Sequence, residues 1–376
     1  MRAAPVALIV SSWVSKILRL QPVLSVTALP LERFSLIVGA RIMSKTISRE
    51  IRLASRPKGL PTADNFILGR IELAPPQDRQ VLVRNLYLSV DPYMRGRMID
   101  RKSYVPPFEL GKALEGGAVG EVVESRAPGF QKGDIVVSNL GWREYFSASA
   151  KQVRRVSRDV QPLSIYLGAL GMTGLTAWAG LHLGEVKAGD VIFVSGAAGA
   201  VGSVAGQLAK LRGCRVLGSA GSAEKVRFLL EECGLDSAFN YKDGSVAEHL
   251  KQAAPDGIDV YFDNVGGETL EAALSVLRVH GRIIACGSIS VYNDERPRPG
   301  PSNLFNMTTK RLTMKGLLVL DWLDRWSEFE KEVGGYLRAG KLKHKETVVE
   351  GIDKTVSAFI GLFQGQNVGK MVVKLA

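Results

Sequence analysis

The sequence between residues 191 and 287 alternates short, continuously apolar runs with segments of helical pattern. Strands that are buried on both faces and joined through helices are typical of a parallel sheet covered by helices on both sides. The apolar runs predict strands at 191–195, 215–220, 258–263 and 281–287, and the segments between them predict helices at 201–211, 223–233 and 268–277. We therefore expect an α/β fold built around a doubly wound parallel sheet.

The sequence before residue 165 has a different character. Short β-rich runs such as VLVRNLYLSV and AVGEVVES are separated by Pro and Gly turn signals, which predicts a compact, antiparallel, barrel-like domain. The strand-like KMVVKL near the end predicts that residues from about 320 onward return to this domain. We expect an N-terminal extension at 1–43, a first domain at 44–165, a second at 166–319 and a return to the first at 320–376.

The N-terminal extension allows two interpretations. Its five serines and single acidic residue up to residue 42 are typical of an organelle transit peptide. Alternatively, Met43 is the ordinary start, and the preceding segment is an isoform extension or an artefact. The apolar stretch from Ala3 to Val14 is shorter than the roughly 18 residues of a membrane span, so no membrane partner is predicted. We expect a cytoplasmic protein, or a mitochondrial or other organellar one if the segment is a transit peptide.

The formal net charge of +12 is diffuse, which argues against nucleic acid as a partner. Basic residues alternate with acidic ones, as in EKVRFLLEE, and no run of Lys and Arg carries interleaved aromatic residues. Binding of an anionic cofactor or a small substrate explains this positive charge better than binding of nucleic acid does. The three cysteines form no CxxC pair and the four histidines are widely spaced, so the sequence predicts neither a disulfide framework nor a metal site.

The segment VIFVSGAAGAVGSVAGQLAK places glycines between a predicted strand and a predicted helix. Three glycines recur at three-residue intervals, and Ala197 stands where the first glycine of a G-x-G-x-x-G pattern would fall. Free N–H groups at the start of the helix can hold a pyrophosphate, so a Rossmann-type dinucleotide site is favoured over a tight packing turn. The predicted contacts are Gly196, Ala197, Gly199, Ala200, Val201 and Gly202.

The end of the next predicted strand distinguishes the two nicotinamide cofactors. Enzymes that use the unphosphorylated cofactor usually place Asp or Glu there, where it bonds the ribose 2′-hydroxyl. Here Gly221 and Ser222 occupy that place, and Lys225 can contact a 2′-phosphate as a cation. The alternative is that Lys225 is an ordinary solvated lysine, but this does not explain why Asp or Glu is absent at the end of this strand. We therefore predict NADPH as the cofactor.

Residues 44–376 resemble the zinc-free medium-chain dehydrogenase/reductases, in particular the group of prostaglandin reductases, leukotriene B4 12-hydroxydehydrogenases and NADPH-dependent 2-alkenal reductases. The resemblance rests on motifs that include SVDPYMRGRM, GALGMTGLTAW, YFDNVGG, CGSISVYN and GKMVVKL. It implies a GroES-like β-barrel catalytic domain at 44–165, an NADP-binding Rossmann domain at 166–319, and a homodimer. The first 42 residues have no place in the family pattern.

The same resemblance implies further contacts to the cofactor. These are Met172 and Thr173 near the nicotinamide, Cys286 and Gly287 along its ribose side, Lys225 and Tyr241 at the 2′-phosphate end, and Asn264 and Asn367 at other parts. A nucleophilic role for Cys286 is the alternative. A small thiol at a strand end is more often a packing residue, however, and no histidine neighbours it in sequence.

The stretch LEGGAVGEV bears on metal dependence. Metal-dependent relatives carry a G-H-E motif, whereas here Leu114 precedes Glu115, so no zinc is predicted. Alcohol oxidation is hard to support without a Lewis acid that lowers the pKa of the hydroxyl group. Reduction of an activated carbon–carbon double bond is easier to support without a metal ion, because hydride can add to the β-carbon of an α,β-unsaturated carbonyl compound.

Two tyrosines are predicted to face the substrate. Negative charge moves to the carbonyl oxygen in this reaction, and that oxygen needs hydrogen-bond donors. Tyr292 in GSISVYN matches the tyrosine that the family places over the substrate, and Tyr93 in DPYMR is the second candidate. The alternative is that both tyrosines lie at the rim of the cleft and their hydroxyls face water. In that case a ribose hydroxyl of the cofactor or solvent would supply the proton.

The sequence therefore predicts an NADPH-dependent reductase that acts on the C=C bond of enones or enals, including lipids similar to 15-keto-prostaglandins. Two alternatives stay open. One is an NADPH:quinone oxidoreductase of the same superfamily, and the other is a non-catalytic protein that binds NADPH or nucleic acid.

Overall fold

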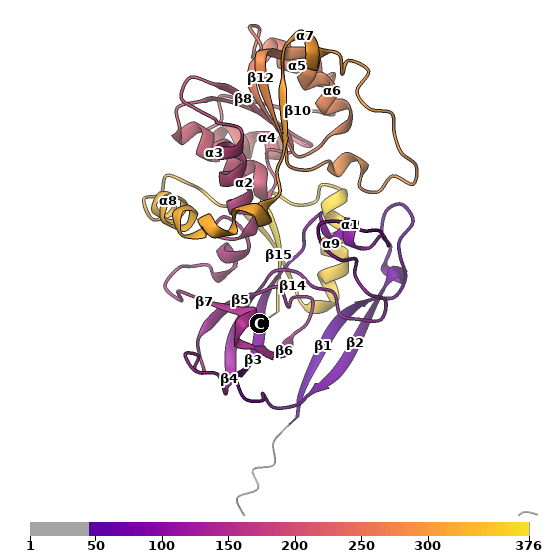
Figure 1. The fold of residues 1–376 in the computed structure, drawn as a ribbon, viewed down its shortest axis with the longest axis vertical. Coiled ribbons are helices and arrows are strands. Elements are labelled where there is room, and N and C mark those ends of the chain that lie inside the picture. The colour runs from indigo at the N-terminus through magenta and orange to yellow at the C-terminus, as the bar shows by residue number, and fades with distance from the viewer. Residues whose placement is uncertain (1–44, 376) are drawn as a thin grey trace, which may run out of the picture. The chain divides into compact units, whose positions relative to one another are not determined.

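The computed structural model describes residues 45–375, and the predictions for residues 1–43 lie outside this range. The described residues contain two large sheets, a parallel one in the upper part of Figure 1 and a mostly antiparallel one in the lower part. The predicted α/β class with a separate antiparallel domain is therefore confirmed.

The parallel sheet has six strands in the order β10-β9-β8-β11-β12-β13. The strands are β8 (Val191–Val194), β9 (Arg215–Ala220), β10 (Ser237–Asn240), β11 (Ile258–Asp263), β12 (Leu277–Ala285) and β13 (Thr313–Gly316). From β8 the chain moves outward through β9 to β10, and it then returns to the other side of β8 with β11. This reversal opens a crevice at the carboxyl ends of β8 and β11, where doubly wound sheets bind their ligands.

Helices connect the parallel strands. They are α3 (Ala200–Leu211), α4 (Ala223–Arg227), which a π-helical turn at Phe228–Glu232 continues, α5 (Val246–Ala253), α6 (Gly267–Val276) and α7 (Asn306–Thr309). The helix α2 (Met172–Leu183) precedes β8 and packs against α3. The start of α4 is set by Ser222, whose side chain accepts a hydrogen bond from the backbone N–H of Lys225.

The second sheet joins strands from both ends of the described range. Its strands are β3 (Gln80–Ser89), β4 (Ala118–Ser125), β5 (Ile135–Ser138), β6 (Tyr145–Ser149), β7 (Val153–Val156), β14 (Glu346–Glu350) and β15 (Lys370–Lys374). β14 and β15 run parallel to each other, and the other pairs are antiparallel. The strand order β14-β15-β3-β4-β5-β7, with β6 also paired to β3, brings the C-terminal strands next to β3. The domain boundaries at 165 and 320 stay a prediction.

The remaining elements are a third, two-stranded sheet and several short helices. β1 (Thr46–Leu53) and β2 (Phe66–Leu73) form an antiparallel pair. The helices are α1 (Met94–Arg97), α8 (Trp326–Arg338) and α9 (Thr355–Phe363). Short 3-10 helices lie at Ala63–Asn65, Ala150–Gln152, Leu163–Leu167, Ile289–Val291, Val319–Arg325 and Ile352–Lys354.

The sequence pattern missed or misplaced several short elements. β10 and β13 were not predicted, β12 begins four residues before the predicted start at 281, and the predicted helix at 223–233 is divided between α4 and its π-helical turn. β13 lies at the sheet edge with three of its four residues exposed, so it lacks the apolar run that marks a buried strand. The helix changes hydrogen-bond pattern at Phe228, which side-chain periodicity does not reveal.

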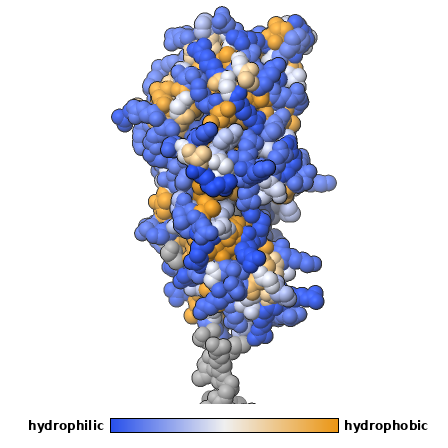
Figure 2. Space-filling model, turned by 90° about the vertical axis from the view of Figure 1, so that its left-hand side faces the viewer, coloured by the Kyte–Doolittle hydropathy of each residue, from blue (hydrophilic) through white to orange (hydrophobic). Residues whose placement is uncertain are grey.

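One hydrophobic cluster continues from one sheet to the other. It includes Val119 and Ile135 of the antiparallel sheet, Ile192 and Val216 of the parallel sheet, and the fully buried Trp178 of α2. On the face shown in Figure 2, hydrophilic side chains predominate and hydrophobic ones form separate patches among them. Within residues 45–375, no helix has the length and apolar character needed to cross a membrane.

Candidate functional site

A cleft of about 1700 Å³ lies where the strand order of the parallel sheet reverses, and residues of both sheets line it. The parallel sheet contributes the segments that follow β8, β9, β11 and β12. The antiparallel sheet contributes the end of β3, the turn that carries Tyr93, and the start of β15. Candidate cofactor and substrate residues from distant parts of the sequence therefore meet in one cavity.

The glycine turn after β8 has the geometry of a phosphate cradle. Gly196 has a φ of +57°, a left-handed conformation that favours glycine. A Cβ added to Gly202 would lie 2.5 Å from the carbonyl oxygen of Gly196, so only glycine lets α3 begin this close to the end of β8. The first N–H groups of a helix have no partner inside the helix, and Gly199, Ala200 and Val201, at the start of α3, line the cleft. This turn fits the pyrophosphate of a dinucleotide.

Two lysines near the end of β9 fit a second phosphate group. Lys225 and Lys242 both line the cleft, and the side chain of Lys225 donates a hydrogen bond of 2.9 Å to the carbonyl oxygen of Gly365. Burial and the positive charge of Lys242 lower the pKa of Lys225. An anionic group would relieve this repulsion, and the 2′-phosphate of NADPH is such a group. An added Cβ on Gly221 would lie 3.1 Å from the hydroxyl of Tyr241, which shows how closely these two residues approach.

A buried carboxylate shapes the loop that follows β11. Asp263 accepts hydrogen bonds from the backbone N–H groups of Val265 at 2.9 Å and Gly266 at 2.7 Å, and from the hydroxyl of Tyr261 at 2.6 Å. Burial raises the pKa of Asp263, and these hydrogen bonds oppose that rise. The side-chain NH₂ of Asn264 donates to the carbonyl oxygen of Ser195 at 2.8 Å, which ties the loop to the end of β8.

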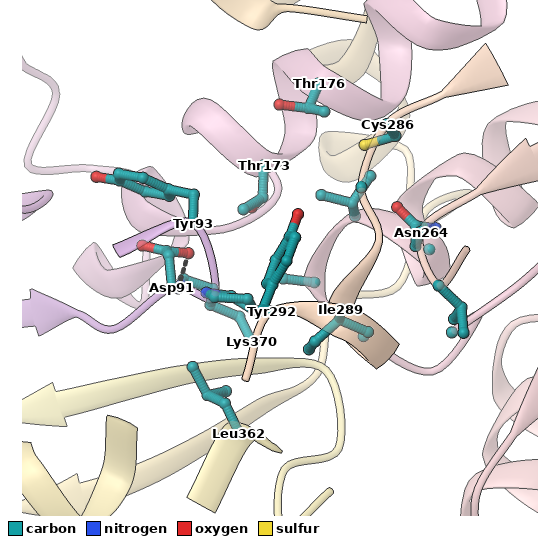
Figure 3. Close-up of a pocket in the computed structure, with 18 of the residues that line it drawn as sticks. Asp91, Tyr93, Thr173, Thr176, Asn264, Cys286, Ile289, Tyr292, Leu362 and Lys370 are labelled. Carbon is teal, nitrogen blue, oxygen red and sulfur yellow. Dashed lines mark hydrogen bonds and ion pairs between the residues drawn. The ribbon is translucent and has the colours of Figure 1, made fainter. Parts of the chain in front are cut away.

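Tyr292 stands in the middle of the cleft, and Figure 3 shows its hydroxyl pointing away from Leu362. The hydroxyl oxygen accepts a hydrogen bond of 3.3 Å from the backbone N–H of Ser288. Burial is the main cause that raises the pKa of Tyr292, so its hydroxyl stays protonated at neutral pH. The oxygen already has a donor, and the proton of Tyr292 is therefore available to a carbonyl oxygen.

Tyr93 lines the cleft from the other sheet, at the residue that precedes α1, and 38% of its surface is exposed. Burial and the nearby charge of Asp91 raise the pKa of Tyr93. Asp91 accepts a hydrogen bond from Ser89 and pairs with Lys370 at 2.7 Å, as the dashed line in Figure 3 marks. Lys370 is buried and also donates to the carbonyl oxygen of Val90 at 3.0 Å, so its pair with Asp91 joins the start of β15 to the end of β3.

Four further predicted residues line the cleft. Met172 and Thr173 lie at the start of α2, where the hydroxyl of Thr173 donates to the carbonyl oxygen of Gly168 at 3.0 Å. Asn367 donates from its side chain to the carbonyl oxygen of Gly369 at 2.8 Å. Burial raises the pKa of the Cys286 thiol to about 12, so this thiol is protonated at neutral pH and is a poor nucleophile.

Two predicted residues do not line the cleft. Ala197 is fully buried, and its backbone N–H donates to the carbonyl oxygen of Ser219 beneath the glycine turn. Ser222 caps α4. The other predicted site residues line the cleft: Tyr93, Met172, Thr173, Gly196, Gly199, Ala200, Val201, Gly202, Gly221, Lys225, Tyr241, Asn264, Cys286, Gly287, Tyr292 and Asn367. Sequence reasoning missed Asp91, Lys242, Asp263 and Lys370, although each lies in or beside a motif.

Two family models match the chain, one for each type of sheet. The N-terminal domain of oxidoreductase matches residues 49–156, and zinc-binding dehydrogenase matches residues 200–334. Between residues 45 and 375, no group of three or more His, Cys, Asp and Glu side chains could hold a metal ion.

Curated proteins are similar over nearly their whole length. A putative NADP-dependent oxidoreductase, YfmJ of Bacillus subtilis, is 47% identical over 332 residues, which are 87% of this chain and 98% of the relative. A 2-alkenal reductase (NADP(+)-dependent) of Nicotiana tabacum is 43% identical over 345 residues, which are 89% of this chain and 99% of the relative.

A solved structure is also similar over most of this chain. The crystal structure of CurA from Vibrio vulnificus in complex with NADPH has 39% sequence identity and a TM-score of 0.84, and the match covers 87% of this chain and 99% of CurA. The two-sheet arrangement described above is therefore shared with an NADPH-binding protein.

Proposed function

Because this chain belongs to the zinc-independent group of the medium-chain dehydrogenase/reductase family, we propose that it is an NADPH-dependent reductase of the C=C bond of α,β-unsaturated carbonyl compounds. The main support for this proposal is the arrangement of residues around the cleft. A glycine phosphate cradle and two tyrosines, which come from different sheets, face the same cleft.

The cofactor residues divide between two charged groups. The turn at Gly196, Gly199 and Gly202 would hold the pyrophosphate, and Lys225 with Tyr241 would hold the 2′-phosphate end. When bound, NADPH supplies a hydride to the β-carbon of the substrate. Helix α2 carries Met172 and Thr173 into the region proposed for the nicotinamide. Figure 3 shows Thr173 on the side of the cleft toward which the Tyr292 hydroxyl points.

Tyr292 would stabilise the charge that develops on the substrate. Its protonated hydroxyl can donate a hydrogen bond to the carbonyl oxygen, where negative charge gathers as the β-carbon is reduced. The Ser288 N–H group fixes the hydroxyl oxygen and so directs the proton toward the cleft. Protonation of the α-carbon, from Tyr292 or from solvent, completes the saturated carbonyl product.

Apolar side chains on the cleft wall suit an apolar substrate. They are Ile289, Leu317, Leu318, Leu362 and Met371. They would cover the hydrocarbon part of an enal or enone and exclude water from the reacting carbonyl group.

A substrate panel tests the proposed function. It contains 2-alkenals, cyclic enones, 15-keto lipids and quinones, each assayed with NADPH and with NADH. We expect NADPH-dependent turnover of enals or enones well above turnover of quinones. Turnover of quinones alone would instead support a quinone oxidoreductase, and a clear preference for NADH would contradict the proposed cofactor.

Replacing Lys225 by alanine is predicted to weaken the binding of NADPH but not that of NADH. Loss of the cation should raise KM for NADPH about tenfold, because a charge-assisted contact to the 2′-phosphate is lost, and KM for NADH should stay within about twofold. Steady-state kinetics with each cofactor measures this ratio. Lys251→Ala is the matched control, since Lys251 is exposed on α5 outside the cleft lining. An equal rise for both cofactors would refute the phosphate contact.

We also propose a homodimer that forms through β13. This strand lies at the edge of the parallel sheet, where its backbone groups can pair with a second copy about a twofold axis. Light scattering on the full chain should give twice the chain mass, and a monomer at micromolar concentration would contradict the proposal. The cytoplasmic location stays a prediction.

A further inference from the structure

Arg95 is a buried cation with no acidic partner within residues 45–375. It lies in α1, two residues after Tyr93, and only 3% of its surface is exposed. One terminal nitrogen, Nη1, is buried without a hydrogen-bond partner. Burying a guanidinium group without a carboxylate lowers stability unless other contacts compensate, so the contacts that Arg95 does make are informative.

The contacts of Arg95 join three segments. Its Nη2 donates to the carbonyl oxygens of Gly59 at 2.9 Å and Pro57 at 3.3 Å, and its Nε donates to the side-chain oxygen of Asn293 at 3.1 Å. Pro57 and Gly59 belong to the loop after β1. Asn293 belongs to the parallel-sheet half of the fold and directly follows Tyr292.

The Arg95–Asn293 hydrogen bond therefore connects the two segments that carry the cleft tyrosines. Arg95 follows Tyr93 within one helical turn, and Asn293 is the next residue after Tyr292. A planar guanidinium group holds its acceptors in a fixed geometry better than a flexible ammonium group does. The loop after β1 and the segment after Tyr292 also pack closely at a second point. A Cβ added to Gly59 would lie 3.1 Å from a carboxylate oxygen of Glu295.

We propose that Arg95 is a positioning residue, which holds the Tyr292 loop at a fixed place opposite Tyr93 through its hydrogen bond to Asn293. Arg95 itself does not line the cleft, so it acts through the tyrosines and not on the substrate. The proposal rests on the proposed function, because it assigns Tyr292 to the substrate carbonyl group.

Asn293→Ala tests this role with little disturbance, because Arg95 keeps its carbonyl acceptors. We expect kcat/KM for an enone to fall about tenfold, while the Kd for NADPH and the melting temperature stay near those of the wild type. Asn293→Asp keeps an acceptor for Arg95 and should retain most of the activity. Asn306→Ala is the matched control, since Asn306 is half-buried, donates to the carbonyl oxygen of Leu274 and lies outside the cleft lining.

A double-mutant cycle separates positioning from a general structural effect. If Asn293 acts through the Tyr292 hydroxyl, Asn293→Ala should lower kcat/KM little further in a Tyr292→Phe background. Fully additive losses, wild-type activity in Asn293→Ala, or an equal loss of NADPH affinity would overturn the positioning role alone. Absence of enone turnover in the wild-type protein would overturn the proposed function, and the positioning role with it.

Discussion

Tyr292→Phe is expected to lower kcat/KM for enones roughly 100-fold, because one preorganised donor to a developing oxyanion contributes an effect of this order. The Tyr292 hydroxyl is the donor whose oxygen is already held by the Ser288 N–H group and whose raised pKa keeps its proton in place. Steady-state kinetics with saturating NADPH measures the loss. The Kd for NADPH should change little, since the lost hydroxyl faces the proposed substrate position.

A matched tyrosine makes this result interpretable. Tyr336 is half-buried on α8, packs against the hydrophobic cluster that joins the sheets, and lies outside the cleft lining. Tyr336→Phe should therefore leave kcat/KM within about twofold of wild type, as expected for a substitution away from the reacting groups. Unchanged rates in Tyr292→Phe would remove the hydroxyl from the mechanism.

Lys370→Met is expected to lower the free energy of unfolding by about 3–5 kcal/mol, because it leaves the charge of Asp91 buried without its partner. The Lys370 side chain is 4% exposed and the Asp91 side chain 14%, and Lys370 bonds both Asp91 and the carbonyl oxygen of Val90. Thermal unfolding should show the effect as a fall in the melting temperature of roughly 10 °C.

The control for this second substitution lies on the same strand. Lys374 pairs with Glu350 at 3.5 Å, and both side chains are exposed. Exposed pairs contribute about 1 kcal/mol or less, so Lys374→Met should barely move the melting temperature. Equal shifts in the two variants would show that the buried pair of Lys370 and Asp91 is not a special source of stability.

The fold could be predicted from the sequence where an apolar run marks a strand that is buried along most of its length. The apolar runs that became β8, β9 and β11 end within one residue of their predicted limits. β10 and β13 could not be recognised in this way, because only one of the four residues of β10 is buried and β13 is mostly exposed. Tertiary pairing with β9 and β12, and not local pattern, makes these segments strands.

The candidate site could be predicted where residues lie inside one local motif. The glycine turn is such a case, since a strand, a turn and a helix follow one another in sequence. The pair Asp91–Lys370 and the contact Arg95–Asn293 join residues about 280 and 200 positions apart, which only the folded chain brings together. Ala197 was predicted from its place in the same motif, and its side chain is buried outside the cleft lining, so a cofactor contact by this residue stays a prediction.

The carbon atom that receives hydride from NADPH distinguishes reduction of the C=C bond from reduction of the carbonyl group. An enone that the enzyme reduces is incubated with NADPH carrying deuterium at both C4 positions, and the product is analysed by NMR spectroscopy and mass spectrometry. We expect one deuterium on the β-carbon of a saturated carbonyl product. Deuterium on the carbinol carbon of a product that keeps its C=C bond would contradict it.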